Sequence, residues 1–87
     1  MLAGKTQSGF EYQIDENIGD DYELLELMGK VKNGDQLSIF ALIDRILGPE
    51  QHNALKEHCR VDGRVSTLKM NDEIVEIFLN TKQVKNS

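Results

Sequence analysis

The sequence predicts a mainly α-helical fold: four short helices packed as a small bundle, with an N-terminal β-strand or hairpin. Apolar residues recur at helical spacing over most of the chain after residue 20, whereas residues 10–15 alternate between apolar and polar side chains. Gly, Asn and Pro separate these segments, as expected at helix ends and tight turns. The 87 residues are enough for one small domain. We expect this domain to span residues 1–80 and residues 81–87 to form a flexible polar tail.

The β element is predicted at about residues 8–15. Within it, Phe10–Asp15 alternates apolar and polar side chains, which is the pattern of a strand with one buried face. Ser8-Gly9 is a turn signal immediately before this alternation. The preceding segment Leu2–Thr6 would pair back as a short hairpin, and such a hairpin has to pack on another part of the protein.

The first helix follows an acidic cap. Asp20 or Asp21 supplies this cap, because a carboxylate at a helix N-terminus accepts hydrogen bonds from free backbone N–H groups. The apolar side chains of this helix are Leu24, Leu25, Leu27, Met28 and Val31. Asn33-Gly34 ends the helix, since both residue types tolerate the left-handed backbone conformation.

The second helix is predicted from Gln36 to Leu47, with Asp35 as its cap. Its apolar residues cover nearly the whole circumference: Leu37, Ile39, Phe40, Ala41, Leu42, Ile43, Ile46 and Leu47. A helix that is apolar on all sides is either central in the fold or carries a face that awaits a partner.

Two further helices complete the predicted fold. The third begins at Pro49, a residue suited to the first helical position, and runs to about Arg60. The fourth is capped by Ser66, and Val65 and Met70 stand at the two positions of a hydrophobic staple. Its buried side is expected to consist of Ile74, Val75, Ile77, Phe78 and Leu79.

The charge distribution excludes some classes of partner. The formal net charge is −5, and the segment Glu11–Glu26 holds seven acids without a base. Nucleic acids and anionic membranes bind basic surfaces, so we expect neither as a partner. We expect no secretory signal, because no apolar region follows the single Lys near the N-terminus, and no apolar run approaches the roughly 20 residues of a membrane span. With Cys59 as its single cysteine, the sequence predicts a soluble intracellular protein without an intrachain disulfide.

Two short patterns resemble ligand-binding loops but lack residues that such loops require. GKT at residues 4–6 matches the end of a phosphate-binding loop, yet only three residues precede it and a strand follows. Asp15 and Glu26 fit the first and last ligand positions of a calcium loop, but Asp20 stands where that loop requires Gly. We therefore expect neither a cofactor nor a metal.

The candidate nucleophiles and bases do not come together either. His52 and His58 point roughly 240° apart around the predicted third helix, so they would not share a metal. The neighbours His58 and Cys59 diverge by roughly 100°, which keeps them from acting as base and nucleophile. We expect a buried structural Cys59, histidines at the surface and no catalytic site. Arg60 and Arg64, on either side of a predicted turn, are expected to pair with acids of the front segment.

The predicted helices carry more apolar surface than so small a domain needs for its core. Part of this surface would stay exposed for a partner or would pair between two copies of the chain. The candidate contacts lie on the first two helices: Leu27, Met28, Ile39, Phe40 and Ile43. Helical spacing does not separate a contact residue from a core residue, so ordinary core packing remains the alternative for each of them.

Four ordered segments carry a resemblance to a known family: SGFEYQID, DDYELLELM, ILGPEQHNALKEHCR and DGRVSTLKMNDEIVEIF. In this order they resemble the small tail assembly chaperones of long-tailed bacteriophages and prophages of Gram-positive hosts. The resemblance covers Ser8 to about Phe78, and none of its segments is a catalytic signature.

The resemblance implies a non-enzymatic function in the cytoplasm of a host bacterium. Members of this family bind the tape-measure protein, a long helical chain that sets tail length, and keep its apolar segments soluble. They also help to recruit the major tail protein during tube polymerisation, and they leave before the tail is complete. The family commonly makes a longer product by −1 ribosomal frameshifting, and Val84-Lys85-Asn86 can be encoded across a slippery heptamer.

A second interpretation, from another functional class, stays open. The acids of Glu11–Glu26 would form a continuous acidic face on a small regulator or inhibitor of a host protein. A long coiled-coil-rich reading frame directly downstream of the gene would favour the chaperone. A repressor or nuclease-inhibitor locus would favour the regulator.

Overall fold

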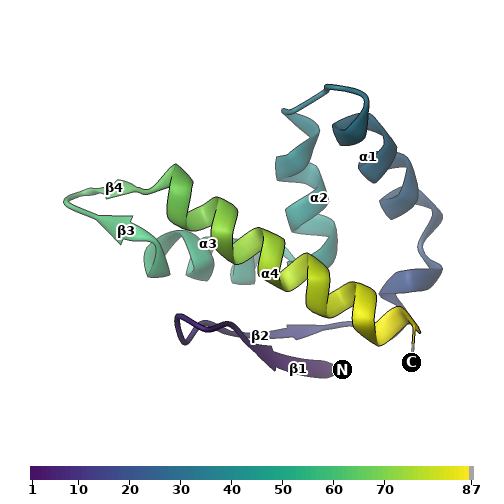
Figure 1. Cartoon of the computed structure of the whole chain (residues 1–87), viewed down its shortest axis with the longest axis horizontal. Coiled ribbons are helices and arrows are strands. Elements are labelled where there is room, and N and C mark those ends of the chain that lie inside the picture. Colours follow the sequence, from purple (N-terminus) through teal and green to yellow (C-terminus); the bar gives the residue numbers. More distant parts are fainter. Residues whose placement is uncertain (87) are drawn as a thin grey trace.

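The computed structural model describes the backbone of residues 1–86 and the side chains of residues 1–80. The elements, in chain order, are β1 (Leu2–Lys5), β2 (Glu11–Ile14), the 3-10 helix η1 (Ile18–Asp20), α1 (Tyr22–Lys32), α2 (Ser38–Leu47), α3 (Pro49–His58), β3 (Arg60–Val61), β4 (Arg64–Val65) and α4 (Thr67–Asn86). Figure 1 shows α4 crossing the molecule, with the β1–β2 hairpin on one side and the paired helices α1 and α2 on the other.

The predicted fold class is confirmed in part: the described residues form four α-helices and an N-terminal hairpin, together with a 3-10 helix and a second short hairpin. The small-bundle arrangement is not confirmed. Helices α1 and α2 lie side by side, whereas α4 passes across the molecule beside the hairpin (Figure 1). Helix α4 is also longer than predicted, with 20 residues. Its last side chains and residue 87 lie outside the described part, so the flexible tail at 81–87 stays a prediction.

The N-terminal hairpin forms as the alternation predicts. Strands β1 and β2 pair antiparallel, with Leu2 opposite Ile14 and Gly4 opposite Tyr12. The apolar residues of β2 and of the position before it are buried: Phe10, Tyr12 and Ile14. The Tyr12 ring lies over Gly4, where any side chain would collide with it. Its hydroxyl accepts a hydrogen bond of 2.7 Å from the Asn80 amide, so the hairpin is also tied to α4.

The cap of α1 is Asp21, one of the two predicted residues. Its carboxylate accepts hydrogen bonds from the backbone N–H groups of Glu23 and Leu24. The cap predicted for α2 is wrong, because α2 begins at Ser38 rather than Gln36. The Asp35 carboxylate accepts a hydrogen bond of 2.8 Å from the Ser38 hydroxyl instead of capping backbone N–H groups. The residues between the helices are held by short-range backbone hydrogen bonds of the turn.

A second, very short hairpin joins α3 to α4, and the sequence did not predict its strands. Its turn residues Asp62 and Gly63 have φ angles of 52° and 84°, as a tight two-residue hairpin turn requires. After β4, Ser66 caps α4 as predicted: its hydroxyl accepts a hydrogen bond of 3.2 Å from the Lys69 backbone N–H. Val65 and Met70, the predicted staple pair, both pack against the core.

One core joins the hairpin to all four helices. Its buried apolar members are Phe10, Tyr12, Ile14, Ile18, Leu24, Leu42, Ile43, Ile46, Leu47, Leu55, Cys59 and Ile77. Leu55 and Ile77 have no exposed surface, and they place α3 and α4 at its centre. Among the described residues, no helix is both long and apolar enough to cross a membrane.

Candidate functional site

The candidate site is an apolar groove between three helices. It encloses about 630 Å³ and is lined by residues 18–21, by Tyr22, Leu24, Leu25 and Met28 of α1, by Leu42 and Ile46 of α2, and by Val75, Phe78 and Leu79 of α4. Leu24, Leu42 and Ile46 are buried, so they form the floor. We refer to this set of residues as the apolar groove.

The walls of the groove are apolar side chains that the fold leaves in solvent. Leu25 on α1 is 61% exposed and Leu79 on α4 is 55% exposed. Met28 and Val75 are about half exposed on the same two helices. Helix α1 buries Leu24 against the core, and Leu25 is rotated from it by roughly 100° around the helix. One turn of α1 therefore supplies both floor and wall.

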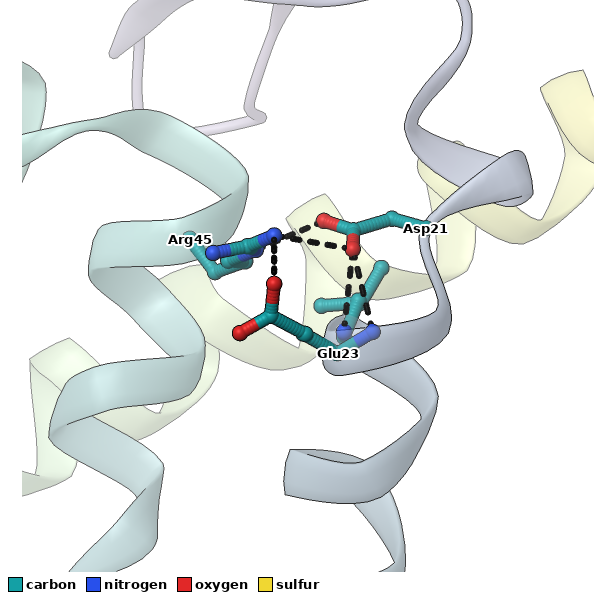
Figure 2. Close-up of polar contacts among 4 residues, drawn as sticks. Asp21, Glu23 and Arg45 are labelled. Carbon is teal, nitrogen blue, oxygen red and sulfur yellow. Dashed lines mark hydrogen bonds and ion pairs between the residues drawn. The ribbon is translucent and has the colours of Figure 1, made fainter.

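One end of the groove is polar and fixed by ion pairs (Figure 2). The Arg45 guanidinium of α2 donates to both carboxylate oxygens of Asp21, at 2.7 Å from Nε and 3.0 Å from Nη2. The same Nη2 donates to Glu23 at 3.3 Å. Because Asp21 also caps α1, these contacts hold the start of α1 against the last turns of α2. They keep the two helices that share the groove in one arrangement.

The charges at this end alter two pKa values. The Arg45 guanidinium lowers the pKa of the Asp21 carboxyl, burial partly opposes it, and backbone N–H groups of α1 lower the pKa further. The hydrogen bond to Asp21 raises the pKa of Arg45 in turn. Both groups therefore stay charged at neutral pH, and the Asp21 charge is matched within the chain.

Comparison with known proteins adds no relative. No protein family, no curated protein and no solved structure matches this chain. Its function has to be argued from its own residues.

The five residues predicted as partner contacts do not form one surface. Met28 lines the apolar groove, whereas Leu27 and Ile39 are partly buried and pack against the core. Phe40 is 57% exposed but lies outside the groove, near the exposed Leu37 before α2. Ile43 is only 2% exposed and belongs to the core. Of the five, Met28 and Phe40 offer substantial surface to a partner.

The groove residues that the sequence interpretation missed lie mostly on α4. Val75 and Leu79 were expected on the buried side, but both are largely exposed. They stand roughly 160–200° around the helix from the fully buried Ile77, which is the opposite side. Apolar residues at 74, 75, 77, 78 and 79 cover more of a helix than one packing face needs. This excess is the signal in the sequence for an exposed apolar side of α4, and the prediction of a single buried side does not account for it.

A polar cluster lies on the other side of α4, at the turn of the N-terminal hairpin, with Thr6 and Glu73 buried and Ser8 and His58 exposed. Thr6 and Ser8 donate hydrogen bonds of 2.8 Å and 2.7 Å to the same carboxylate oxygen of Glu73. His58 Nε2 lies 2.9 Å from the Ser8 hydroxyl. Nearby, the Gln7 backbone N–H donates to Glu76 at 2.9 Å. We call Thr6, Ser8, His58 and Glu73 the polar cluster.

The polar cluster has the residue types of a catalytic triad but not its geometry. In a triad, the base accepts the serine proton through one ring nitrogen and a carboxylate orients the other nitrogen. Here the Ser8 hydroxyl donates its hydrogen bond to Glu73 and not to the histidine. The Glu73 oxygen lies 3.8 Å from His58 Nε2, the same ring nitrogen that contacts Ser8. The cluster instead ties the hairpin to α3 and α4. Glu73 is buried and has its partners, as a buried carboxylate requires.

Other predicted side chains are found in different surroundings. Cys59 is buried, as predicted, and burial raises the pKa of its thiol. His52 is not at the surface as predicted: it is buried, and its Nδ1 lies 2.6 Å from the Asp44 carboxylate. Arg60 does not reach the front segment, because it pairs with Glu57 at 2.6 Å within its own neighbourhood. Among the described residues, no group of three or more His, Cys, Asp or Glu side chains is arranged to hold a metal.

Proposed function

We propose that this chain is a non-enzymatic tail assembly chaperone of a long-tailed phage or prophage, and that it binds the tape-measure protein. The observation that carries the proposal is the apolar groove, whose walls expose leucine, methionine and valine side chains from two helices. Contiguous exposed apolar surface in a small domain is typical of a protein interaction site. The resemblance of segments 8–78 to such chaperones supplies the identity of the partner.

The shape of the groove suits an amphipathic helix. A partner helix that lies in a groove contacts it through side chains at positions i, i+3 or i+4, and i+7. Leu25 and Met28 of α1 face one side of such a helix, and Val75 and Leu79 of α4 face the other. Exposed methionine and leucine side chains also adapt to different apolar sequences. A chaperone for a long chain with many apolar segments needs this tolerance.

The acidic surface outside the groove suits a chaperone that binds its partner only temporarily. The net charge of −5 opposes precipitation while apolar side chains are exposed.

The exposed Leu37 and Phe40, outside the groove, are a second apolar patch, and we propose it as the contact for the major tail protein. In this proposal the chain acts in the host cytoplasm, needs no cofactor and leaves before the tail is complete. A frameshifted longer form would extend it after Val84-Lys85-Asn86.

The test is co-expression with an apolar fragment of the tape-measure protein, measured as the fraction of that fragment that stays soluble. We expect the native chain to keep it soluble, and Leu25→Asp and Leu79→Asp to lose this activity. Leu68→Asp is the matched control, because Leu68 is 81% exposed on α4 but does not line the groove. Circular dichroism checks that all variants keep their helices. Equal activity of the groove variants and the control would contradict the proposal.

The acidic regulator remains a second candidate because of one observation. Six of the seven acids between Glu11 and Glu26 are exposed, and only Asp21 is partly covered. A regulator that binds through this charge would lose its partner when Glu11, Asp15 and Glu16 are changed to the corresponding amides, and would not respond to Leu79→Asp. The chaperone predicts the reverse order of effects, so the same two variants separate the candidates.

A further inference from the structure

The polar residues of the apolar groove are not spread along it. Its polar or small lining residues are consecutive, Gly19 to Tyr22, and they all lie at the junction of η1 and α1. The other lining residues are apolar. The groove therefore has an apolar body and one polar end, and it contains two charged residues, Asp20 and Asp21, which are both acids.

Of these two acids, one is already neutralised. Asp21 is held by Arg45 in a two-point ion pair (Figure 2). Asp20 is exposed, and the described residues provide no hydrogen bond or ion pair to its carboxylate. No lysine or arginine is among the described lining residues. Among the described residues, the polar end of the groove thus presents one unmatched negative charge, that of Asp20, next to apolar surface.

We infer that the groove takes an amphipathic helix whose apolar stripe is flanked by a lysine or arginine, with this basic residue against Asp20. The inference rests on the proposed function and specifies the chemistry of the partner segment. The α1 residues that line the groove lie between Tyr22 and Met28, so this wall is about 10 Å long, at about 1.5 Å per residue. The apolar stripe of the partner therefore covers about two turns. Its basic residue stands directly beyond that stripe.

The charge of the chain argues against a second copy as the occupant. A copy that docked through the same groove would bring the same two acids and no base. Each copy also carries a net charge of −5, so close approach is opposed by repulsion. A lysine or arginine of a different protein would contact Asp20 without this repulsion.

The experiment compares two synthetic helical peptides with an identical stripe of four leucines at helical spacing. One peptide carries two lysines at each end and the other carries two glutamates, so that either docking direction is tested. Fluorescence anisotropy at low ionic strength measures the dissociation constants. We expect the lysine peptide to bind about two- to fivefold more tightly through Asp20. The preference should shrink at high salt, because exposed charges are screened.

Two variants identify the source of the preference. Asp20→Asn should leave the ion-paired Asp21 as the only acid among the described lining residues and remove most of the difference between the peptides. Asp62→Asn is the matched control: it makes the same charge change at an exposed residue in the β3–β4 turn, which is not part of the groove lining, and should keep the difference. An equal response of the two variants would overturn the role of Asp20.

The outcomes separate this inference from the proposed function. If both peptides bind equally and Leu25→Asp removes both, the groove binds apolar helices without a basic preference, and only the inference fails. If neither peptide binds, or Leu25→Asp has no effect on binding, both fail. If sedimentation shows a dimer that Leu25→Asp separates, the occupant is a second copy and the inference is overturned.

Discussion

Two sides of helix α4 differ in their surroundings. One side contacts the N-terminal hairpin through polar side chains, and the other presents apolar side chains to the groove. On the side of the hairpin, Glu73 and Glu76 accept hydrogen bonds from residues near position 7, far away in the sequence. On the other side, Val75 and Leu79 line the apolar groove and remain largely in solvent. One helix therefore carries a buried polar contact and an exposed apolar surface. Glu73 and Leu79 thus depart from the usual distribution of polar and apolar residues, whereas the fully buried Ile77 follows it.

This contrast separates the polar cluster, which stabilises the fold, from the apolar groove, which is available to a partner. The polar cluster is complete, and the described residues contain no buried side-chain nitrogen or oxygen without a hydrogen-bond partner. A complete buried network specifies one arrangement of the elements around it. The apolar side chains of the groove, in contrast, stay in contact with water, and the described residues offer them no further surface for burial. Changes to the first region should alter stability, and changes to the second should alter binding.

The largest expected effect comes from comparing a core leucine with a groove leucine. Leu55 is 0% exposed and Leu79 is 55% exposed. Leu55→Ala removes buried methyl groups and leaves a cavity, so it should lower the free energy of unfolding by about 2–5 kcal/mol. Leu79→Ala should change it by less than about 0.5 kcal/mol. Urea denaturation measures both, and similar losses would mean that the groove is closed in solution.

The polar cluster should give the next largest effect. Glu73→Ala takes away the acceptor of two hydroxyls, including that of the buried Thr6, and should cost about 1–3 kcal/mol. Glu73→Gln keeps an acceptor and should cost less. Asp72→Ala is the control, because Asp72 is exposed on the same helix. Peptide binding to the groove should be unchanged in any variant that stays folded, and a selective loss of binding would contradict the division between the two sides.

The sequence predicted local structure better than it predicted surroundings. The cap at Ser66 and the turn before it at Asp62-Gly63 were predicted, and Asp21 was one of the two residues proposed as the cap of α1, because this chemistry acts over three or four residues. The cap proposed at Asp35 failed because two more residues of turn precede α2. Turn length is set by how α1 and α2 pack, and that information is not local.

The residues of the groove also show that local sequence patterns do not reveal which surface a side chain packs against. Five of the apolar positions of α4 were assigned to one buried side, and periodicity could not reveal that Val75 and Leu79 face an open groove. Ile43 is the opposite case: it was predicted as a partner contact and is buried in the core. A helix that is apolar nearly all round does not indicate which of its sides is covered. The polar cluster was not predicted at all. Thr6 and Glu73 are 67 residues apart, and no pattern in a single sequence pairs them.

The smallest expected effect is at the polar end of the groove, where the ion pair is exposed. Arg45 lowers the pKa of Asp21 below its unfolded value near 3.8, so this contact stabilises the fold above that pH. The stabilisation is lost as the pH falls through the lower folded pKa, where Asp21 becomes protonated. Arg45→Gln should therefore lower stability slightly at neutral pH, and its stability curve should converge with that of the native chain on acidification.

Arg64→Gln makes the same charge change as Arg45→Gln at an exposed residue with no ion pair among the described side chains. It should follow the native chain across the whole pH range. An NMR titration of the Asp21 carboxyl gives the direct measurement: its midpoint should rise in Arg45→Gln and stay in place in Arg64→Gln. An unchanged midpoint in Arg45→Gln would mean that the helix N-terminus alone lowers this pKa. The exposed ion pair would then contribute little to the position of α1 against α2, which the buried core residues of both helices would hold.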